Sequence, residues 1–402
     1  MSKRRRFLGV SHGSGERRAF LPSRGGDSVS PTWRFLDSGA RTAAENVALD
    51  HVLIRSRLRG GPSTLRLLQF SQECCLVGYH QAVEVEVEEG FCSAEGIVIG
   101  RRLTGGGTIY LDQSQLGWEV CAARGEAGLP TRVEDLYATL GGAVARALND
   151  WGVPARFRPL NDLEVNGKKI SGTGGTEETG VFLFQGTLLV RSDVERMMRC
   201  LRVPAAKLQE KGLLHAKDRI TSLEFELGTT PLMSELKAKV ASRLAEAIGV
   251  ELVPAGLSGW ERTALRRALP TFAATEWVHR VSLPAGMAGS AEARHRADGG
   301  LIHVRLSLDR RRNRIRYVSI TGDFFAYPPR VIPDLEAALT ASPATADEVR
   351  SRVEAFWDRS SPQIPGIGVR QMLIPLLRAL ERANVAAVRK PSKGAQRALR
   401  RS

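Results

Sequence analysis

The stretch RRLTGGGTIYLDQSQLGWEV, residues 101–120, joins two arginines to three consecutive glycines and then to an extended, partly apolar run. Three adjacent glycines weaken a helix or strand, because glycine loses the most backbone freedom on folding. Their amide groups can approach an anion closely, and the neighbouring guanidinium groups supply positive charge. The fingerprints GxGxxG and GxxxxGKS/T are absent, so neither a dinucleotide fold nor a P-loop is indicated. The run therefore predicts a flexible turn or an anion-binding loop.

A second polar constellation follows in NDLEVNGKKISG, residues 161–172. The Asn-Gly pair between short alternating runs predicts a hairpin with a type I′ turn. The pairing expected from that turn sets Glu164 opposite Lys169 and Asp162 opposite Ser171, all on one face. A carboxylate diagonal to an ammonium suits a phosphate–metal substrate. The alternative is a solvated face with a surface ion pair worth about 0–1 kcal/mol.

Hydrophobic periodicity predicts a mixture of helices and strands. Amphipathic helices are expected from Thr42 to Gly60, from Thr131 to Gly152 and from Ser234 to Ile248. The run GVFLFQGTLLV, residues 180–190, is typical of a buried strand. Composition shifts over 280–298, which indicates a linker or long loop. Beyond it we expect a second hairpin over 301–319 and helices near 330–341, 345–358 and 369–388.

Composition excludes several classes of protein. The 402 residues are 43% hydrophobic, and no apolar run reaches the roughly 18 residues of a membrane span. The start SKRRRFLG has no apolar segment after it, so export is not expected. Five cysteines form no CxxC pair, which favours a reducing cytoplasm over a disulfide framework or a zinc site.

The net charge of +15 lies mostly in the tails, because residues 1–30 and 382–402 carry +12 of it. The basic tails are either solvated chain ends or segments that attract an acidic partner. A nucleic-acid enzyme more often carries its basic surface on the folded body. Residues 1–30 are too short and too polar for a helix-turn-helix module, so no nucleic-acid partner is expected.

Five segments occur in the order seen in the lipoate–protein ligase family, which belongs to the biotin/lipoate ligase and octanoyltransferase superfamily. They are WRFLDSGARTAAENVALDHVL, LVGYHQ, RRLTGGGTIYLD, NDLEVNGKKISG and GVFLFQGTLLV. GGLIHVRLSLDRRRNRIRYVSITGDFF resembles the family's C-terminal accessory domain. The resemblance implies an α/β (α+β) fold: a catalytic domain of mixed and antiparallel sheets flanked by helices, and a smaller α+β accessory domain. The boundaries it implies are a disordered basic tail over 1–30, a catalytic domain over 31–262, a linker over 263–298, an accessory domain over 299–388 and a basic tail over 389–402.

The resemblance implies an ATP-dependent ligase. Such an enzyme uses ATP and Mg²⁺ to activate lipoate or octanoate as an acyl adenylate, then acylates a lysine of a lipoyl carrier protein. The alternative is an ATP-independent octanoyl or lipoyl transferase between carrier proteins. Octanoyltransferases work through a cysteine thioester beside the acyl pocket, and RFRPLNDLEV and GVFLFQGTLL contain no cysteine, which favours the adenylate. We expect a cytoplasmic monomer with no tightly bound cofactor and no membrane partner.

The resemblance also assigns the site. Lys169 matches the family's essential lysine, which bridges carboxylate and phosphate and does electrostatic work. The adenylate-binding residues implied with it are Arg102, Gly105, Gly106, Gly107, Thr108, Ile109, Tyr110, Asn161 and Asp162, with Asp162 also on Mg²⁺. The acyl-pocket residues implied are His80, Leu111, Gln185 and Gly186, and simple packing is the alternative for His80.

Two departures leave the acyl substrate open, because Leu111 and Gln185 stand where the family commonly shows histidine. Lipoate, octanoate and other medium-chain acids all remain possible. Arg101 is expected to be a strand-end charge or a helper. Lys207, Lys211 and Arg219 belong either to a basic loop near the nucleotide or to an ordinary connector.

Overall fold

The computed structural model describes residues 30–202, 217–281 and 290–388. Lys207, Lys211 and the basic tails, apart from Ser30, lie outside these ranges, so the predictions made for them stay predictions. From Pro31 onward the described chain belongs to one unit. None of its described helices is long and apolar enough to cross a membrane.

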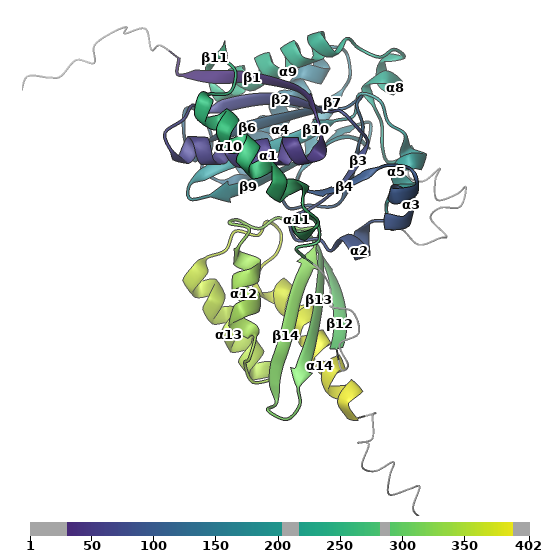
Figure 1. The fold of residues 1–402 in the computed structure, drawn as a ribbon, viewed down its shortest axis with the longest axis vertical. Helices are drawn as coiled ribbons and strands as arrows, with labels where there is room; N and C mark the ends of the chain where they lie inside the picture. The colour runs from purple at the N-terminus through teal and green to yellow at the C-terminus, as the bar shows by residue number, and fades with distance from the viewer. Residues whose placement is uncertain (1–29, 203–216, 282–289, 389–402) are drawn as a thin grey trace, which may run out of the picture. The chain divides into compact units, whose positions relative to one another are not determined.

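An eight-stranded mixed sheet forms the centre, in the order β11-β1-β2-β6-β10-β9-β8-β7 (Figure 1). β1 pairs in parallel with β2 and β11, and the other neighbours are antiparallel. This arrangement confirms the predicted mixture of sheet types. The strands are β1 (Thr32–Arg41), β2 (Thr64–Phe70), β6 (Leu116–Ala123), β7 (Ala155–Arg158), β8 (Asp162–Val165), β9 (Lys168–Glu178), β10 (Val181–Leu188) and β11 (Glu251–Pro254).

Helices cover both faces of this sheet. On one face, α4 (Val133–Asn149) and α9 (Met233–Ile248) pack in a core that includes Val120 and Phe184. On the other, α1 (Ala43–Leu58) and α10 (Gly259–Ala273) pack in a cluster that includes Cys121 and Leu183. Neighbours along one strand face opposite sides of a sheet. The continuous apolar run in β10 therefore indicates burial on both faces.

Local signals place the helix ends as expected. Thr42 and Glu45 form the predicted capping box at the start of α1, where each side chain satisfies a backbone amide. α9 ends at Gly249, whose φ of +77° is left-handed, a conformation that costs glycine little. The predicted helices therefore differ from the observed ones only by a few residues at their ends.

A small sheet, in the order β4-β3-β5, carries the glycine run. β4 (Val98–Arg101) and β5 (Ile109–Leu111) flank β3 (Cys74–Val77), and the glycines lie in the connection between β4 and β5. Short helices surround this sheet and the pocket next to it. They are α2 (Val83–Glu86), α3 (Glu89–Ala94), α5 (Val194–Cys200), α8 (Leu223–Leu227) and α11 (Thr275–Val278).

The C-terminal region builds a core of its own from a three-stranded sheet and three helices (Figure 1). The strands are β12 (Ser290–Ala297), β13 (Gly300–Asp309) and β14 (Arg314–Gly322), and the helices are α12 (Val331–Leu339), α13 (Ala346–Ser360) and α14 (Val369–Val388). The β13–β14 hairpin and these helices agree with the sequence expectation.

The described parts of 263–298 differ from the linker expected there. Most of α10, all of α11 and strand β12 fall in this range. Leu265 and Ala268 of α10 pack against the cluster around α1. β12 is held by its antiparallel pairing with β13, a contact that the polar, alanine-rich composition of the segment does not reveal.

Glu336 gives the stability of the C-terminal region a pH dependence. Burial raises the pKa of this carboxyl group to about 7, although the Ile320 amide donates a 2.6 Å hydrogen bond to it. Because the folded-state pKa is raised, protonated Glu336 contributes stability that is fully present below the unfolded pKa near 4.5. This stability is lost as the pH rises through about 7. We expect Glu336→Gln, which keeps the acceptor, to stabilise the protein by about 3 kcal/mol at pH 8 and little at pH 4.

Thermal melts at both pH values check this prediction, with the exposed Glu354→Gln as control. An equal effect of Glu336→Gln at both pH values would contradict it.

Candidate active site

A cavity of about 200 Å³ lies between the glycine run, β9, β10 and α5. The structure brings most of the predicted site residues to its wall. Those that line it are Arg102, Gly105, Gly106, Gly107, Thr108, Ile109, Tyr110, Leu111, Asn161, Lys169, Gln185 and Gly186. Asp162 stands just behind Lys169, and His80 does not line the cavity.

Arg102 holds the glycine loop from beneath. Its guanidinium is buried and donates to the carbonyls of Leu76, Gly105 and Gly107, at 2.7–2.9 Å, and to the hydroxyl of Thr104. Burial lowers the pKa of Arg102 to about 10. The sequence suggested that this arginine covers an anion, but its donors are directed to backbone carbonyls and to the Thr104 hydroxyl. Its role in this structure is to shape the loop.

The glycines make room for another part of the chain. A Cβ at Gly105 would lie 2.4 Å from the Phe324 carbonyl oxygen, and one at Gly106 would lie 2.8 Å from the Phe325 ring. The Gly106 amide donates to the Phe324 carbonyl at 3.1 Å. At least this amide is therefore not free to bind an anion. Close backbone approach, rather than flexibility, explains these two glycines.

The hairpin forms with the predicted turn, since Asn166 and Gly167 both have positive φ, +50° and +82°. Glu164 pairs with Lys169 as expected. A bulge then shifts the register, so that Leu163 faces Ser171 and Asp162 faces Gly172. The expected pairing of Asp162 with Ser171 is therefore wrong. One extra residue on the bulged strand re-aims its side chains.

An ion pair with Asp162 positions the Lys169 side chain at the cavity. Its ammonium lies 2.7 Å from Asp162 Oδ1, and 40% of its side chain is exposed. A Cβ at Gly172 would lie 3.0 Å from the ammonium, so this glycine also leaves it space. A cation at the mouth of a cavity can stabilise negative charge that develops on a bound group.

The environment of Asp162 does not fit the expected Mg²⁺. Its second oxygen lies 2.6 Å from Arg158, so two cations already contact the two oxygens. A divalent cation there would be repelled by both. Asn161 is also engaged, because its amide donates to the Thr173 carbonyl at 3.0 Å. No step of the reaction is therefore assigned to a metal at this position.

Two polar side chains of the cavity carry information about the ligand. Gln185 Oε1 is buried and has no hydrogen-bond partner within the described residues, which leaves an acceptor for a ligand donor. Tyr110 instead donates to Glu73 at 2.7 Å. Beside them Ile109, Leu111, Leu189 and Met197 contribute apolar wall. The cavity is thus mainly apolar, with a few polar groups at fixed positions.

Of the two roles expected for His80, bordering the acyl pocket or simple packing, its contacts favour packing. Its ring stacks on Phe324 with 5.1 Å between centroids. Burial, with Arg280 and Arg101 nearby, lowers the pKa of His80 to about 3. Arg101 ends β4 as expected, but it is buried and donates to five backbone carbonyls. Arg219 contributes its carbonyl to the Lys169 amide, and its side chain does not line the cavity.

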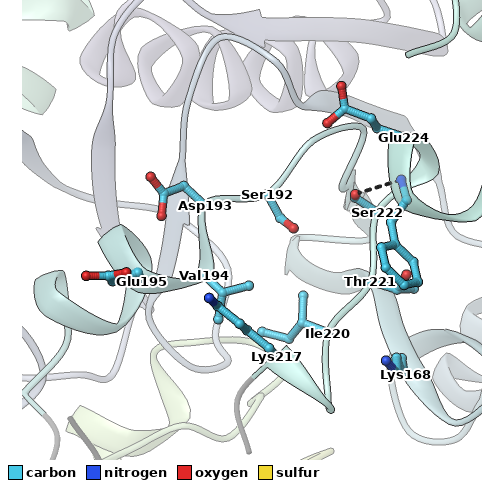
Figure 2. A pocket seen from close by; sticks show the side chains of 11 residues that line it. Lys168, Ser192, Asp193, Val194, Glu195, Lys217, Ile220, Thr221, Ser222 and Glu224 are labelled. Atoms are coloured by element: carbon cyan, nitrogen blue, oxygen red, sulfur yellow. Dashed lines mark hydrogen bonds between the residues drawn. The ribbon is translucent and has the colours of Figure 1, made fainter. Parts of the chain in front are cut away.

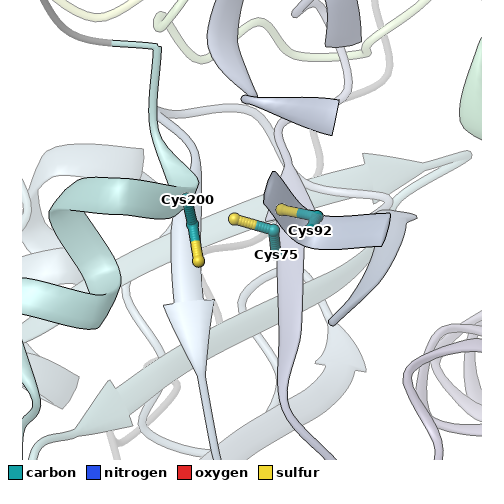
Figure 3. A group of neighbouring side chains, drawn as sticks. All are labelled: Cys75, Cys92 and Cys200. Atoms are coloured by element: carbon teal, nitrogen blue, oxygen red, sulfur yellow. The ribbon is translucent and has the colours of Figure 1, made fainter. Parts of the chain in front are cut away.

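All five cysteines are buried, and none lines the cavity. Three of them, Cys75, Cys92 and Cys200, come from β3, α3 and α5 and bring their sulfurs within 4.8 Å of one another (Figure 3). Their spacing in the sequence gives no hint of this group. Buried thiols among apolar side chains pack as small apolar groups, and three sulfurs this close could also hold a soft metal.

A wider hollow of about 650 Å³ adjoins the cavity, and Ile220 belongs to both walls. Lys168, Lys217 and Glu224 place charges around it (Figure 2). Phe225 at its edge is 71% exposed. The sequence analysis did not single out this surface, because its residues come from β9, α5 and the segment around α8.

Comparison with known proteins identifies the class. The family model described as "Lipoyl protein ligase A/B catalytic domain" matches residues 42–245, and the chain belongs to this family. Octanoyltransferase LipM of Kyrpidia tusciae is 29% identical over 273 residues, covering 62% of this chain and 99% of the relative.

Two solved structures share the fold. The bi-partite lipoate protein ligase of Thermoplasma acidophilum is 23% identical with a TM-score of 0.57, over 64% of this chain and 100% of its own. LipL1 of P. falciparum, in complex with lipoate, is 14% identical with a TM-score of 0.63, over 80% of this chain and 94% of its own.

Further sequence relatives correct the predicted activity. Together with the protein of Kyrpidia tusciae, five relatives, each matched over 91–99% of its own length, are named Octanoyltransferase LipM. The main prediction of an ATP-dependent ligase is therefore wrong, and the stated alternative is better supported. The ATP, Mg²⁺ and acyl adenylate that accompanied the ligase are not confirmed. The absence of a cysteine from the cavity wall does not by itself require adenylate chemistry.

Arg102 should be essential for the shape of the loop. Arg102→Met removes the donor from four polar acceptors, and unsatisfied buried acceptors are costly, so we expect a loss of roughly 3 kcal/mol in unfolding free energy. Chemical denaturation measures it. Arg156→Ala, at a side chain that is 75% exposed, is the control and should change little. Equal effects of the two variants would contradict the role given to Arg102.

Proposed function

We propose that the protein transfers an octanoyl group from the thioester of one carrier protein to a lysine of a lipoyl carrier protein, without ATP. The observation that carries the proposal is the shared name of the five relatives, octanoyltransferase. The acceptor class is also supported by the fold neighbour from Thermoplasma acidophilum, which was solved as part of a lipoylation system with its lipoyl domain.

The size and lining of the cavity fit this substrate. Its volume of about 200 Å³ is below the roughly 300–1,000 Å³ of pockets that hold drug-sized ligands. The apolar wall of Ile109, Leu111 and Met197 suits a saturated chain. A medium-length acyl group can be accommodated in such a space.

Lys169 would stabilise the reaction electrostatically. Attack on a thioester carbonyl places negative charge on its oxygen, and a preorganised cation lowers the energy of that state. The 2.7 Å contact with Asp162 fixes the ammonium at the mouth of the cavity. Because Asp162 is itself held by Arg158, the lysine is positioned before the substrate arrives.

We infer that the acyl group moves directly from donor to acceptor, unlike the cysteine thioester relay that the resemblance implies for octanoyltransferases. A relay through the enzyme needs a thiol beside the acyl carbon, and none of the five cysteines lines the cavity. In direct transfer the acceptor amine forms a C–N bond to the carbonyl carbon and the C–S bond breaks. The amine proton then passes to the departing donor thiolate.

We further propose that the enzyme works as a monomer in the cytoplasm. Five buried free thiols suit a reducing compartment. Both donor and acceptor would be protein substrates that leave after each turnover, so no tightly bound cofactor is needed.

Incubation with an octanoyl carrier protein and an apo lipoyl domain tests the function. We expect the lipoyl domain to gain the mass of one octanoyl group in the absence of ATP. Intact-protein mass spectrometry provides the readout. Modification that required free octanoate, ATP and Mg²⁺ would overturn the proposal.

Replacing Lys169 should abolish transfer without unfolding the protein. We expect Lys169→Met to lower kcat/KM by about 10²–10³, the usual effect of losing one group that stabilises an oxyanion. The melting temperature should change little, because the side chain is 40% exposed. The neighbouring Lys168→Met is the control, since Lys168 does not line the cavity. A Lys169 variant with full activity would remove this residue from the mechanism.

Direct transfer predicts that no single cysteine is required. Each of the five Cys→Ala variants should retain transfer once its folded fraction is taken into account from a thermal melt. Trapping with an octanoyl thioester donor alone should leave no acyl group on the enzyme. A variant that melts like the wild type but loses all transfer would show that its thiol is the nucleophile.

A further inference from the structure

Residues 324–327, which follow β14, connect two hydrophobic cores, because their side chains point alternately into one core and the other. Phe324 and Ala326 are buried in the core of the C-terminal region. Phe325 and Tyr327 are buried in the core formed by the large sheet, α4 and α9. Successive side chains of an extended segment point to opposite sides. Residues 324–327 therefore insert every second side chain into the catalytic part of the protein.

Phe325 becomes part of the cavity wall in this way. It lines the cavity beside β9, and it is 9% exposed. Two glycines admit its ring, since a Cβ at Gly106 or Gly174 would lie 2.8 Å or 3.0 Å from it. Its ring also meets Tyr137 of α4 at 6.0 Å between centroids.

The backbone and rings on either side fix Phe325 in place. The Phe324 carbonyl accepts from Gly106, and the Gly322 amide donates to the His80 carbonyl, both at 3.1 Å. The hydroxyl groups of Tyr327 and Tyr137 lie 2.7 Å apart and are buried. Tyr327 also stacks on Phe182 with 5.8 Å between centroids. The ring is therefore held from both sides and cannot move aside at low cost.

We propose that Phe325 is the specificity-determining wall of the acyl cavity, so that the C-terminal region limits the length of the acyl chain. Identification of the ligand as an acyl chain rests on the proposed function. The family model ends at residue 245, so this wall comes from outside the matched catalytic domain. A cavity of about 200 Å³ bordered by a fixed ring leaves little room for added methylene groups.

Transfer from hexanoyl, octanoyl, decanoyl and dodecanoyl carrier proteins tests the proposal. Phe325→Ala should raise the ratio of kcat/KM for decanoyl over octanoyl at least about tenfold, because one methylene in an apolar pocket changes discrimination by roughly 10–200-fold. Phe325→Trp should shift the preference toward hexanoyl. Unchanged preferences in both variants would overturn the proposal.

Phe356→Ala is the matched control, because Phe356 is buried in the core of the C-terminal region and does not line the cavity. It should lower the melting temperature and leave the chain-length preference unchanged. If the chain-length preference shifted equally in this control, the effect of Phe325→Ala would come from general loosening of the fold. That result would contradict a specific role for Phe325 as the cavity wall.

A binding measurement separates this proposal from the proposed function. Calorimetric titration with free octanoate, decanoate and dodecanoate reports on the cavity even if the wild type transfers nothing. Phe325→Ala should then gain at least about tenfold in affinity for decanoate relative to octanoate. If transfer fails but binding shifts, the function is wrong and the wall stands. If transfer occurs but neither preference moves, only the wall is wrong.

Discussion

The close approach of two backbones is the constraint on which the rest of the site depends. Gly105 and Gly106 meet the Phe324 carbonyl and the Phe325 ring at distances that a Cβ would not allow. Arg102 holds the same loop from the other side through backbone carbonyls. The loop is thus fixed between a buried arginine and a segment more than 200 residues away in the chain. Its glycines serve packing first, and this packing sets the shape of the cavity.

The charged side chains at the site form a series of ion pairs rather than one isolated cation. Arg158 contacts Asp162, and Asp162 contacts Lys169 at the cavity mouth. The other conspicuous cations, Arg101 and Arg102, are buried and satisfied by carbonyl groups. Only Lys169 of these cations is presented to a ligand at the cavity mouth. Lys169 is thus placed where it can stabilise one developing negative charge.

Much of the fold was predictable because its signals are local. The capping box at Thr42, the Asn166-Gly167 turn and the left-handed Gly249 each arise from neighbouring residues. Most of the cavity residues were also predicted, because they belong to motifs that occur in the same order as in the family. The activity could not be predicted from these motifs, because ligases and transferases of one fold share them. The names of the relatives, not the motifs, corrected it.

The sequence by itself determined the family, most helices and strands, and the place of Lys169 beside the glycine run. Tertiary structure alone decided the bulge in β9 that sets Asp162 opposite Gly172, the grouping of Cys75, Cys92 and Cys200, and the insertion of Phe325. The physical reason is that these features join segments distant in the chain, where hydrogen bonding and shape complementarity, not local periodicity, select the partner. A GDFF motif shows that two aromatic rings are present, but only the folded chain assigns one to each core.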